Sequence, residues 1–300
     1  PICWDTPKLI NELIDYIQPQ ILVFSRTDLW PELITQIHKR HIKLGVISYN
    51  PSFGIMSDLV NQRLLKNMNF ISVLDQNIKI KLENIGIFKN IFVDGDTRFD
   101  QVFYRLSQKP KLKIHSSHKI FVCGSTWPED ERVLLPCFRE LLAKNIKIIL
   151  CPHEVDTSSI LRLKRELDRL QYSYKFLSSE SDFFNISLNK DIFIIDTVGY
   201  LADVYRDADV AFVGGSYKEK IHSVMEPLCC GLPVITGPFY QNSPEAIKYQ
   251  KSYVFNTSAP EDISKNVLKL LTASKSDLLA EMKTNLNSSQ KVLDHMRQQT

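Results

Sequence analysis

Glycine is scarce in this sequence, with ten in 300 residues, and cysteine is scarcer still, with six. No two cysteines stand in a CxxC spacing and no cysteine–histidine zinc pattern occurs, so we expect reduced core thiols and a cytosolic protein. No apolar run approaches the ~20 residues that cross a bilayer as a helix. No signal peptide is visible, and the chain opens at Pro1 without a methionine. The net charge of +3 is too small to indicate a nucleic-acid partner.

Several catalytic signatures are also missing. The sequence has no HExxH, no GxSxG and no GxxxxGK[ST], which removes the common zinc-protease, nucleophile-elbow and P-loop chemistries. Asp94-Gly95-Asp96 matches the DxD that holds a metal in some sugar transferases, but one short match is weak. We therefore expect no metal site.

Short apolar runs alternate with helical patterns along the chain. Many of the runs are nearly continuous Val, Ile, Leu and Phe, as expected of strands covered on both faces. This alternation predicts an α/β fold with parallel sheets between helices. The expected strands are 21–26, 42–48, 70–75, 90–94, 119–124, 146–152, 174–178, 191–196, 209–215 and 232–237, and the expected helices include 7–17, 30–40, 57–68, 129–144, 158–170 and 200–207.

A polar, basic segment with a proline, SQKPKLKIHSSH at 107–118, is the best linker in the chain. It predicts a division into 1–112 and 113–260, followed by a helical segment, 261–300, that packs back across a cleft. The first unit has four strand candidates, fewer than a Rossmann-type unit usually has. We therefore expect it to be truncated on its N-terminal side.

Ligands of open parallel sheets bind at the carboxyl ends of the strands. Gly124-Ser125-Thr126 follows one expected strand and precedes a helix, where free N–H groups would suit a phosphate. Taken alone, these residues favour an ordinary Ser or Thr helix cap. Pro152-His153 follows the next strand, where the imidazole could face a ligand or only solvent. Gly199 follows a further strand, in a turn that opens a helix.

Four of the ten glycines fall in the stretch FVGGSYKEKIHSVMEPLCCGLPVITGP at 212–238. Gly214-Gly215-Ser216 would form a strand-end loop whose backbone N–H groups bind phosphate. His222, Ser223 and Glu226 would then lie on the first turns of a helix, with His222 and Glu226 on one face. A carboxylate there can accept two hydrogen bonds from the diol of a ribose. The alternative is a glycine-terminated helix with a solvated His–Glu pair.

The motifs together resemble the Kdo transferases, GT-B glycosyltransferases that move 3-deoxy-D-manno-octulosonic acid (Kdo) from CMP-Kdo to lipid A precursors. The resemblance covers roughly residues 20–250, and its last two motifs are the specific ones. In chain order the matching pieces are Asp28-Leu29-Trp30-Pro31, Gly95-Asp96-Thr97-Arg98-Phe99-Asp100, Gly124-Ser125-Thr126, Pro152-His153, Gly199 with Leu201, Phe212-Val213-Gly214-Gly215-Ser216, His222-Ser223-Val224-Met225-Glu226-Pro227 and Gly231-Leu232-Pro233-Val234-Ile235-Thr236-Gly237-Pro238.

The resemblance implies two Rossmann-like domains, an acceptor-side one followed by one that binds the nucleotide sugar. It implies inverting transfer from CMP-Kdo, with no metal or other cofactor, by a cytoplasmic enzyme held peripherally at the inner membrane. Asp28 matches an acidic position near the acceptor, while the family's glutamate base is expected upstream of this chain. The residues implied around CMP are Gly124, Ser125, Thr126, Pro152, His153, Gly199, Gly214, Gly215, Ser216, His222, Ser223 and Glu226.

At three positions the sequence departs from the family pattern. Ser223 stands where the family usually has Asn, Tyr200 where a Glu is common, and His153 where an Arg is frequent. Two other functions stay open on the sequence alone. One is a GT-B enzyme that uses a UDP-sugar, either a transferase or an epimerase, and the other is a catalytically silent nucleotide-binding protein.

Overall fold

The computed structural model describes residues 5–51, 62–88, 90–180, 184–188 and 190–299. The chain divides into two compact units, the first formed by Pro1–Gln101 with Asn285–Thr300 and the second by Val102–Thr284. The division falls inside helix α5 (Arg98–Ser107), a few residues before the segment that the sequence predicted as a linker. Each unit has its own parallel sheet and its own apolar core. The chain therefore has the α/β fold that the sequence predicted. In the part of the chain that is described, no helix is both long and apolar enough to cross a membrane.

Unit 1 is built on a four-stranded parallel sheet of order β1-β2-β3-β4. Ile34, Ile37 and Val46, from a helix and a strand of the unit, are fully buried in its core. The strand order runs in one direction with no reversal. The elements are α1 (Pro7–Ile17), β1 (Ile21–Ser25), α2 (Pro31–Lys39), β2 (Lys43–Tyr49), β3 (Phe70–Val73), α4 (Gln76–Asn84), β4 (Ile91–Val93) and α13 (Ser288–Gln299).

The terminal helix α13 belongs to unit 1, whereas the preceding helices after residue 260 belong to unit 2. Asp100 accepts hydrogen bonds from the backbone N–H groups of Asn287 (2.8 Å) and Ser289 (2.6 Å), at the start of α13. Further along, His295 stacks on Phe92 and lies 3.2 Å from the Asp94 carboxylate. These contacts attach α13 to the sheet of unit 1.

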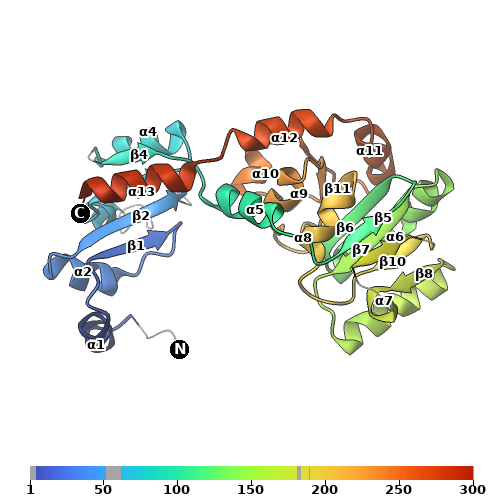
Figure 1. Cartoon of the computed structure of the whole chain (residues 1–300), viewed down its shortest axis with the longest axis horizontal. Coiled ribbons are helices and arrows are strands. Elements are labelled where there is room, and N and C mark those ends of the chain that lie inside the picture. Colours follow the sequence, from blue (N-terminus) through green and yellow to red (C-terminus); the bar gives the residue numbers. More distant parts are fainter. Residues whose placement is uncertain (1–4, 52–61, 89, 181–183, 189, 300) are drawn as a thin grey trace. The chain divides into compact units, whose positions relative to one another are not determined.

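Unit 2 contains a seven-stranded parallel sheet of order β13-β12-β11-β6-β7-β10-β8 and a two-stranded parallel pair, β5-β9. Figure 1 shows β11, β6, β7, β10 and β8 of the larger sheet. The elements of unit 2 are β5 (Lys113–His115), β6 (Ile120–Thr126), α6 (Pro128–Ala143), β7 (Lys147–Pro152), α7 (Thr157–Arg169), β8 (Tyr174–Phe176), a short 3-10 turn (Leu177–Ser179), β9 (Asn185–Ser187), β10 (Ile192–Ile194), α8 (Leu201–Asp207), β11 (Val210–Val213), α9 (Met225–Cys229), β12 (Val234–Thr236), α10 (Pro244–Lys248), β13 (Val254–Asn256), α11 (Asp262–Leu270) and α12 (Lys275–Lys283).

All ten expected strands are present, with shorter bounds in most cases, and β5, β9 and β13 were not predicted. Strand β5 lies inside the expected linker 107–118 and pairs with β9, so that part of the segment is not a free connection. Of its three residues only the middle one is buried, so the sequence has no continuous apolar run here from which a strand could be predicted. Residues 57–61 of the expected helix 57–68 lie outside the described residues, and 62–65 are helical.

The strand order of unit 2 contains a reversal that unit 1 lacks. From β6 the chain builds outward through β7, and it later returns to place β11 against the other edge of β6. At such a point the connections after the two central strands leave toward opposite sides and open a crevice between them. In unit 2 this point falls at the carboxyl ends of β6 and β11, which carry the Gly124 and Gly214 motifs.

Candidate functional site

The carboxyl end of β6 carries a local irregularity at Ser125. The pairing of β6 with β7 is regular up to Gly124 and shifts before Thr126, and Ser125 has φ +53°. A non-glycine residue in this region is strained, and such strain is commonly stored at functional sites. Helix α6 then begins after Trp127, which is its N-cap residue, so the Ser or Thr cap considered from the sequence is not what the structure contains. The Thr126 hydroxyl instead donates to Glu131 (3.1 Å).

The glycine loop after β11 is held by a buried carboxylate that sequence analysis missed. Asp130 accepts from the backbone N–H groups of Gly215 (2.7 Å), Tyr217 (3.0 Å) and Trp127 (2.9 Å) and is fully buried. The N–H of Gly214 donates to the Gly124 carbonyl oxygen (2.8 Å). The sequence predicted that the N–H groups of this loop bind phosphate. In the structure the N–H groups of Gly214, Gly215 and Tyr217 donate to acceptors within the protein. Asp130 was detectable as an acid at the third position of a helix that follows a strand end.

Ser216 is a structural residue of the same loop. Its side chain is buried, its hydroxyl donates to the Val213 carbonyl oxygen (2.9 Å), and it accepts from the N–H of Gly237 (2.8 Å). These two bonds connect the carboxyl ends of β11 and β12. Any role of Ser216 toward a ligand would therefore act through the shape of the loop.

Glycine is required at these motif positions for different physical reasons. A Cβ on Gly214 would lie 2.1 Å from the Ser125 carbonyl oxygen, and one on Gly124 would lie 2.0 Å from the Tyr205 hydroxyl. These two positions are glycine because the chain packs against them. Gly199 is exposed, has φ +94°, and has no heavy atom within 4 Å of a built Cβ. Of the three, Gly199 is where another molecule could approach the backbone.

Three aromatic rings gather beside the glycine loop. The ring planes of Trp127 and His222 are nearly parallel, at 8°, and the Trp127 indole N–H donates to Nε2 of His222 (2.9 Å). His153 stacks on both, with ring centroids 4.6 Å from Trp127 and 4.4 Å from His222. The Lys218 ammonium lies 3.2 Å from the Trp127 ring centroid, a cation–π contact. The structure thus brings together His153 and His222, from two strand-end connections, through a tryptophan that was not predicted.

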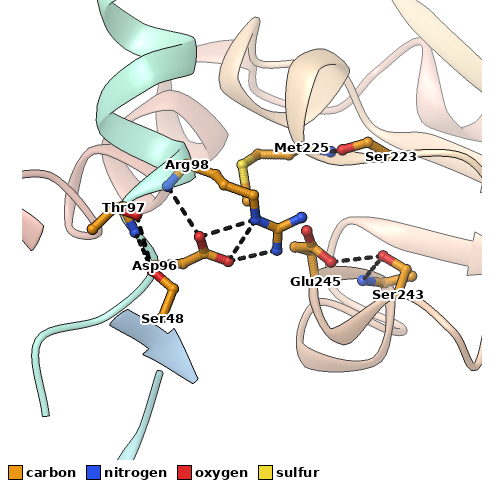
Figure 2. Close-up of polar contacts among 9 residues, drawn as sticks. Ser48, Asp96, Thr97, Arg98, Ser223, Met225, Ser243 and Glu245 are labelled. Atoms are coloured by element: carbon orange, nitrogen blue, oxygen red, sulfur yellow. Dashed lines mark hydrogen bonds and ion pairs between the residues drawn. The ribbon is translucent and has the colours of Figure 1, made fainter. Parts of the chain in front are cut away.

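His222 and Glu226 do not share a helix face as the sequence predicted. Helix α9 begins at Met225, so His222 and Ser223 lie in the loop before it, and the predicted i, i+4 relationship is wrong. The Ser223 hydroxyl accepts from the N–H of Met225 (3.3 Å), a short-range turn that precedes the helix (Figure 2). The stretch 217–223 contains two lysines, a tyrosine and no helical apolar period, which is why it turns before the helix forms.

Glu226 stands in the first turn of α9 and forms an ion pair with Arg105 of α5 (2.8 Å). Both belong to unit 2. Its charge also acts on Tyr205, the buried phenol beside Gly124, whose pKa is raised well above its ordinary value mainly by burial. Arg105 was not predicted, because 121 residues separate it from its partner.

Burial controls the protonation of two site residues. The pKa of His222 is lowered, first by burial and then by His153, Lys220 and Lys218, so the imidazole is neutral at neutral pH. Burial raises the pKa of Asp130, while the three backbone N–H donors act in the opposite direction. Perturbed groups of this kind are enriched at functional sites.

Two further predicted residues are not members of this ring cluster, although Pro152 directly precedes His153 in the chain. Pro152 ends β7 and is half-buried, and its register partner is Thr126. Asp28 is exposed in the connection between β1 and α2 of unit 1. Its expected acceptor-side role stays a prediction.

The two carboxylates of the DxD-like sequence are engaged inside unit 1. Asp94 lies against His295, and both oxygens of Asp96 accept from the Arg98 guanidinium, with Nε 3.0 Å from each; Figure 2 shows this pair beside the Ser48–Thr97 hydroxyl contact. Within the described ranges, no three His, Cys, Asp or Glu side chains cluster in a way that could hold a metal ion.

Comparison with known proteins gives two family matches and a set of relatives that match most of this chain. Residues 1–101 match the family described as 3-deoxy-D-manno-octulosonic-acid transferase, and residues 183–288 match glycosyl transferases group 1. The chain is 29% identical to the 3-deoxy-D-manno-octulosonic acid transferase of Chlamydophila psittaci over 252 residues, which is 79% of this chain and 56% of that protein. It is 26% identical to the Rickettsia prowazekii transferase of the same name, over 94% of this chain and 63% of the relative.

A solved structure agrees with the fold. The UDP-GlcNAc 2-epimerase of Neisseria meningitidis aligns with a TM-score of 0.63 at 15% identity, covering 97% of this chain and 80% of the epimerase. At that identity the likeness shows the GT-B fold alone. The chain spans little more than half the length of the curated transferases given above. Within that span it is similar to the Kdo transferase family over most of its own length, as the motifs predicted.

Proposed function

We propose that unit 2 binds a CMP-activated sugar and that the protein transfers Kdo from CMP-Kdo to a lipid A precursor. The observation that carries this proposal is the meeting of the Gly124 and Gly214 motifs at the switch point between β6 and β11. Open α/β sheets bind nucleotides in that crevice. The resemblance to Kdo transferases supplies the identity of the donor.

Each group of the site has a proposed role. Glu226 accepts hydrogen bonds from the ribose diol, and the exposed backbone at Gly199 lets the nucleotide approach closely. His222 and His153 face the anionic part of the donor. The glycine loop is kept in shape by Asp130 and Ser216, so it supports the pocket wall while the N–H groups of Gly214 and Gly215 stay engaged inside the protein.

The transfer would proceed with inversion, by direct displacement at the anomeric carbon with CMP as leaving group, and without a metal. The protein would act in the cytoplasm, attached peripherally to the inner membrane where a lipid acceptor is found. These finer points rest on the family resemblance. Asp28 remains the candidate on the acceptor side.

Calorimetric titration with CMP, UDP and AMP tests the proposal. CMP should bind at least about tenfold more tightly than UDP, because a base pocket that hydrogen-bonds one pyrimidine edge leaves groups unpaired with the other. Tighter binding of UDP would indicate a UDP-sugar enzyme instead. If none of the three nucleotides bound, unit 2 would not contain a nucleotide site.

A further inference from the structure

In the hydrogen bond between Trp127 and His222, only one assignment of donor and acceptor is chemically possible. An indole has an N–H and no acceptor nitrogen, so Nε2 of His222 must accept the bond. A neutral imidazole that accepts at Nε2 carries its proton on Nδ1. The 2.9 Å contact therefore selects one tautomer of His222.

The surroundings of His222 reinforce this state. His153 stacks on its ring, with the two centroids 4.4 Å apart, and the glycine loop approaches it at Gly215; the charges of Lys218 and Lys220 also act on it. Half-burial is the main cause that disfavours a second proton on the ring, and His153, Lys220 and Lys218 act in the same direction. An imidazolium would also lose the acceptor that Trp127 needs. The ring is consequently held neutral, with Nδ1–H as its donor.

The position of Trp127 allows it to act in this way. It is the N-cap residue of α6, and its own backbone N–H is fixed by Asp130, the carboxylate that also holds the glycine loop. The indole is further packed by the His153 ring and the Lys218 ammonium. One buried carboxylate thus sets the geometry of both the tryptophan and the loop that His222 contacts.

We propose that Trp127 is a positioning residue that holds His222 as the Nδ1–H tautomer, so that this N–H donates to an anionic oxygen of the nucleotide ligand. The ligand part of this inference rests on the proposed function. The tautomer itself does not, because it is a property of the unliganded chain.

The first experiment is made without nucleotide. In the ¹⁵N-labelled chain near pH 7.5, a two-bond ¹H–¹⁵N correlation spectrum, with His222 assigned from a His222→Gln variant, reports which nitrogen carries the proton. We expect a protonated Nδ1 and an unprotonated Nε2 in the wild type, and exchange between tautomers in Trp127→Phe, which keeps a ring but lacks the N–H. A protonated Nε2 in the wild type, or an unchanged tautomer in Trp127→Phe, overturns the inference.

A second measurement covers the case in which Trp127→Phe does not fold. The indole N–H resonance of Trp127 should shift when His222→Ala removes its acceptor, while the resonance of Trp30 stays in place. An unmoved Trp127 resonance contradicts the hydrogen bond.

The ligand part is tested by CMP titration. Trp127→Phe should weaken CMP binding roughly fivefold, the factor expected if the competent tautomer falls to about a fifth of the population. Trp30→Phe, the same substitution in unit 1, is the matched control and should leave the affinity unchanged. Unchanged affinity in Trp127→Phe despite a changed tautomer would overturn the positioning role. Failure of the wild type to bind CMP would reject the proposed function, and the tautomer spectrum would still decide the first part.

Discussion

Arg105 Nη1 and Glu226 Oε1 are 2.8 Å apart, so the carboxylate that we assign to the ribose already has a cationic partner. The Arg105 side chain is half exposed, and exposed pairs of this kind contribute little, about 0.2–1 kcal/mol. A ribose diol that forms two charge-assisted hydrogen bonds can compete with such a partner.

Replacing Glu226 with alanine should weaken CMP binding by at least about tenfold, because charge-assisted hydrogen bonds contribute roughly 1.5–3 kcal/mol each. The fold should survive, because the side chain faces partly into solvent. Calorimetry measures the loss. Glu219→Ala is the control. Glu219 is exposed in a turn before α9, and the CMP affinity of this variant should differ from that of the wild type by less than about twofold. Equal affinity in wild type and Glu226→Ala would make the residue part of a solvated surface.

The Arg105→Ala variant distinguishes two roles of Arg105: competing with the ribose for the Glu226 carboxylate, or binding the nucleotide itself. If Arg105 only occupies the Glu226 carboxylate, its removal should leave CMP affinity unchanged or tighten it by up to about fivefold, the value of a weak exposed pair. The same titration measures it. A loss as large as that of Glu226→Ala would show that the guanidinium itself binds the nucleotide.

Asp130→Asn should destabilise unit 2 by about 1–3 kcal/mol, because an amide replaces one acceptor oxygen and leaves a backbone donor without its partner. Urea unfolding followed by circular dichroism gives the change. The exposed Glu154→Gln makes the same type of substitution and should stay within about 0.5 kcal/mol. Similar stability for the two variants would mean that Asp130 does not hold the loop.

Two glycine substitutions should have opposite consequences. Gly214→Ala places a methyl group 2.1 Å from the Ser125 carbonyl oxygen, so we expect loss of soluble, folded protein. Gly199→Ala has open space around it and should fold, at a cost of about 1–2 kcal/mol for its positive φ, but should bind CMP more weakly. Soluble expression, thermal unfolding and titration distinguish the two. Full CMP affinity in Gly199→Ala would remove that position from the site.

The lowered pKa of His222 predicts a pH dependence. A group whose folded-state pKa lies below its ordinary value contributes stability above the ordinary value, and this stability is lost as pH falls through the folded-state pKa. Between pH 7.5 and 5 the wild type should therefore lose more thermal stability than His222→Gln, in which this titration is absent. Parallel curves for the two proteins would show that His222 does not contribute.

The sequence was sufficient to predict the α/β class and all ten of the expected strands, because buried parallel strands are continuous apolar runs that are legible locally. It also located Gly124, His153 and Gly214 at strand ends. The short strands β5 and β9 were not legible, since a three-residue strand with one buried side chain has no periodicity and depends on its partner.

What the sequence alone determined is which residue types stand at each strand end; what tertiary structure decided is which of their atoms are available. Helical spacing predicted that His222 and Glu226 share a face, but the helix starts at Met225. Asp130, which is far away in sequence, accepts hydrogen bonds from the N–H groups of Gly215 and Tyr217. Trp127 donates to Nε2 of His222 and thereby selects the ring nitrogen that carries the proton. A hydrogen bond joins groups by distance in space, and the strand order that brings β6 beside β11 creates those distances only in the folded chain.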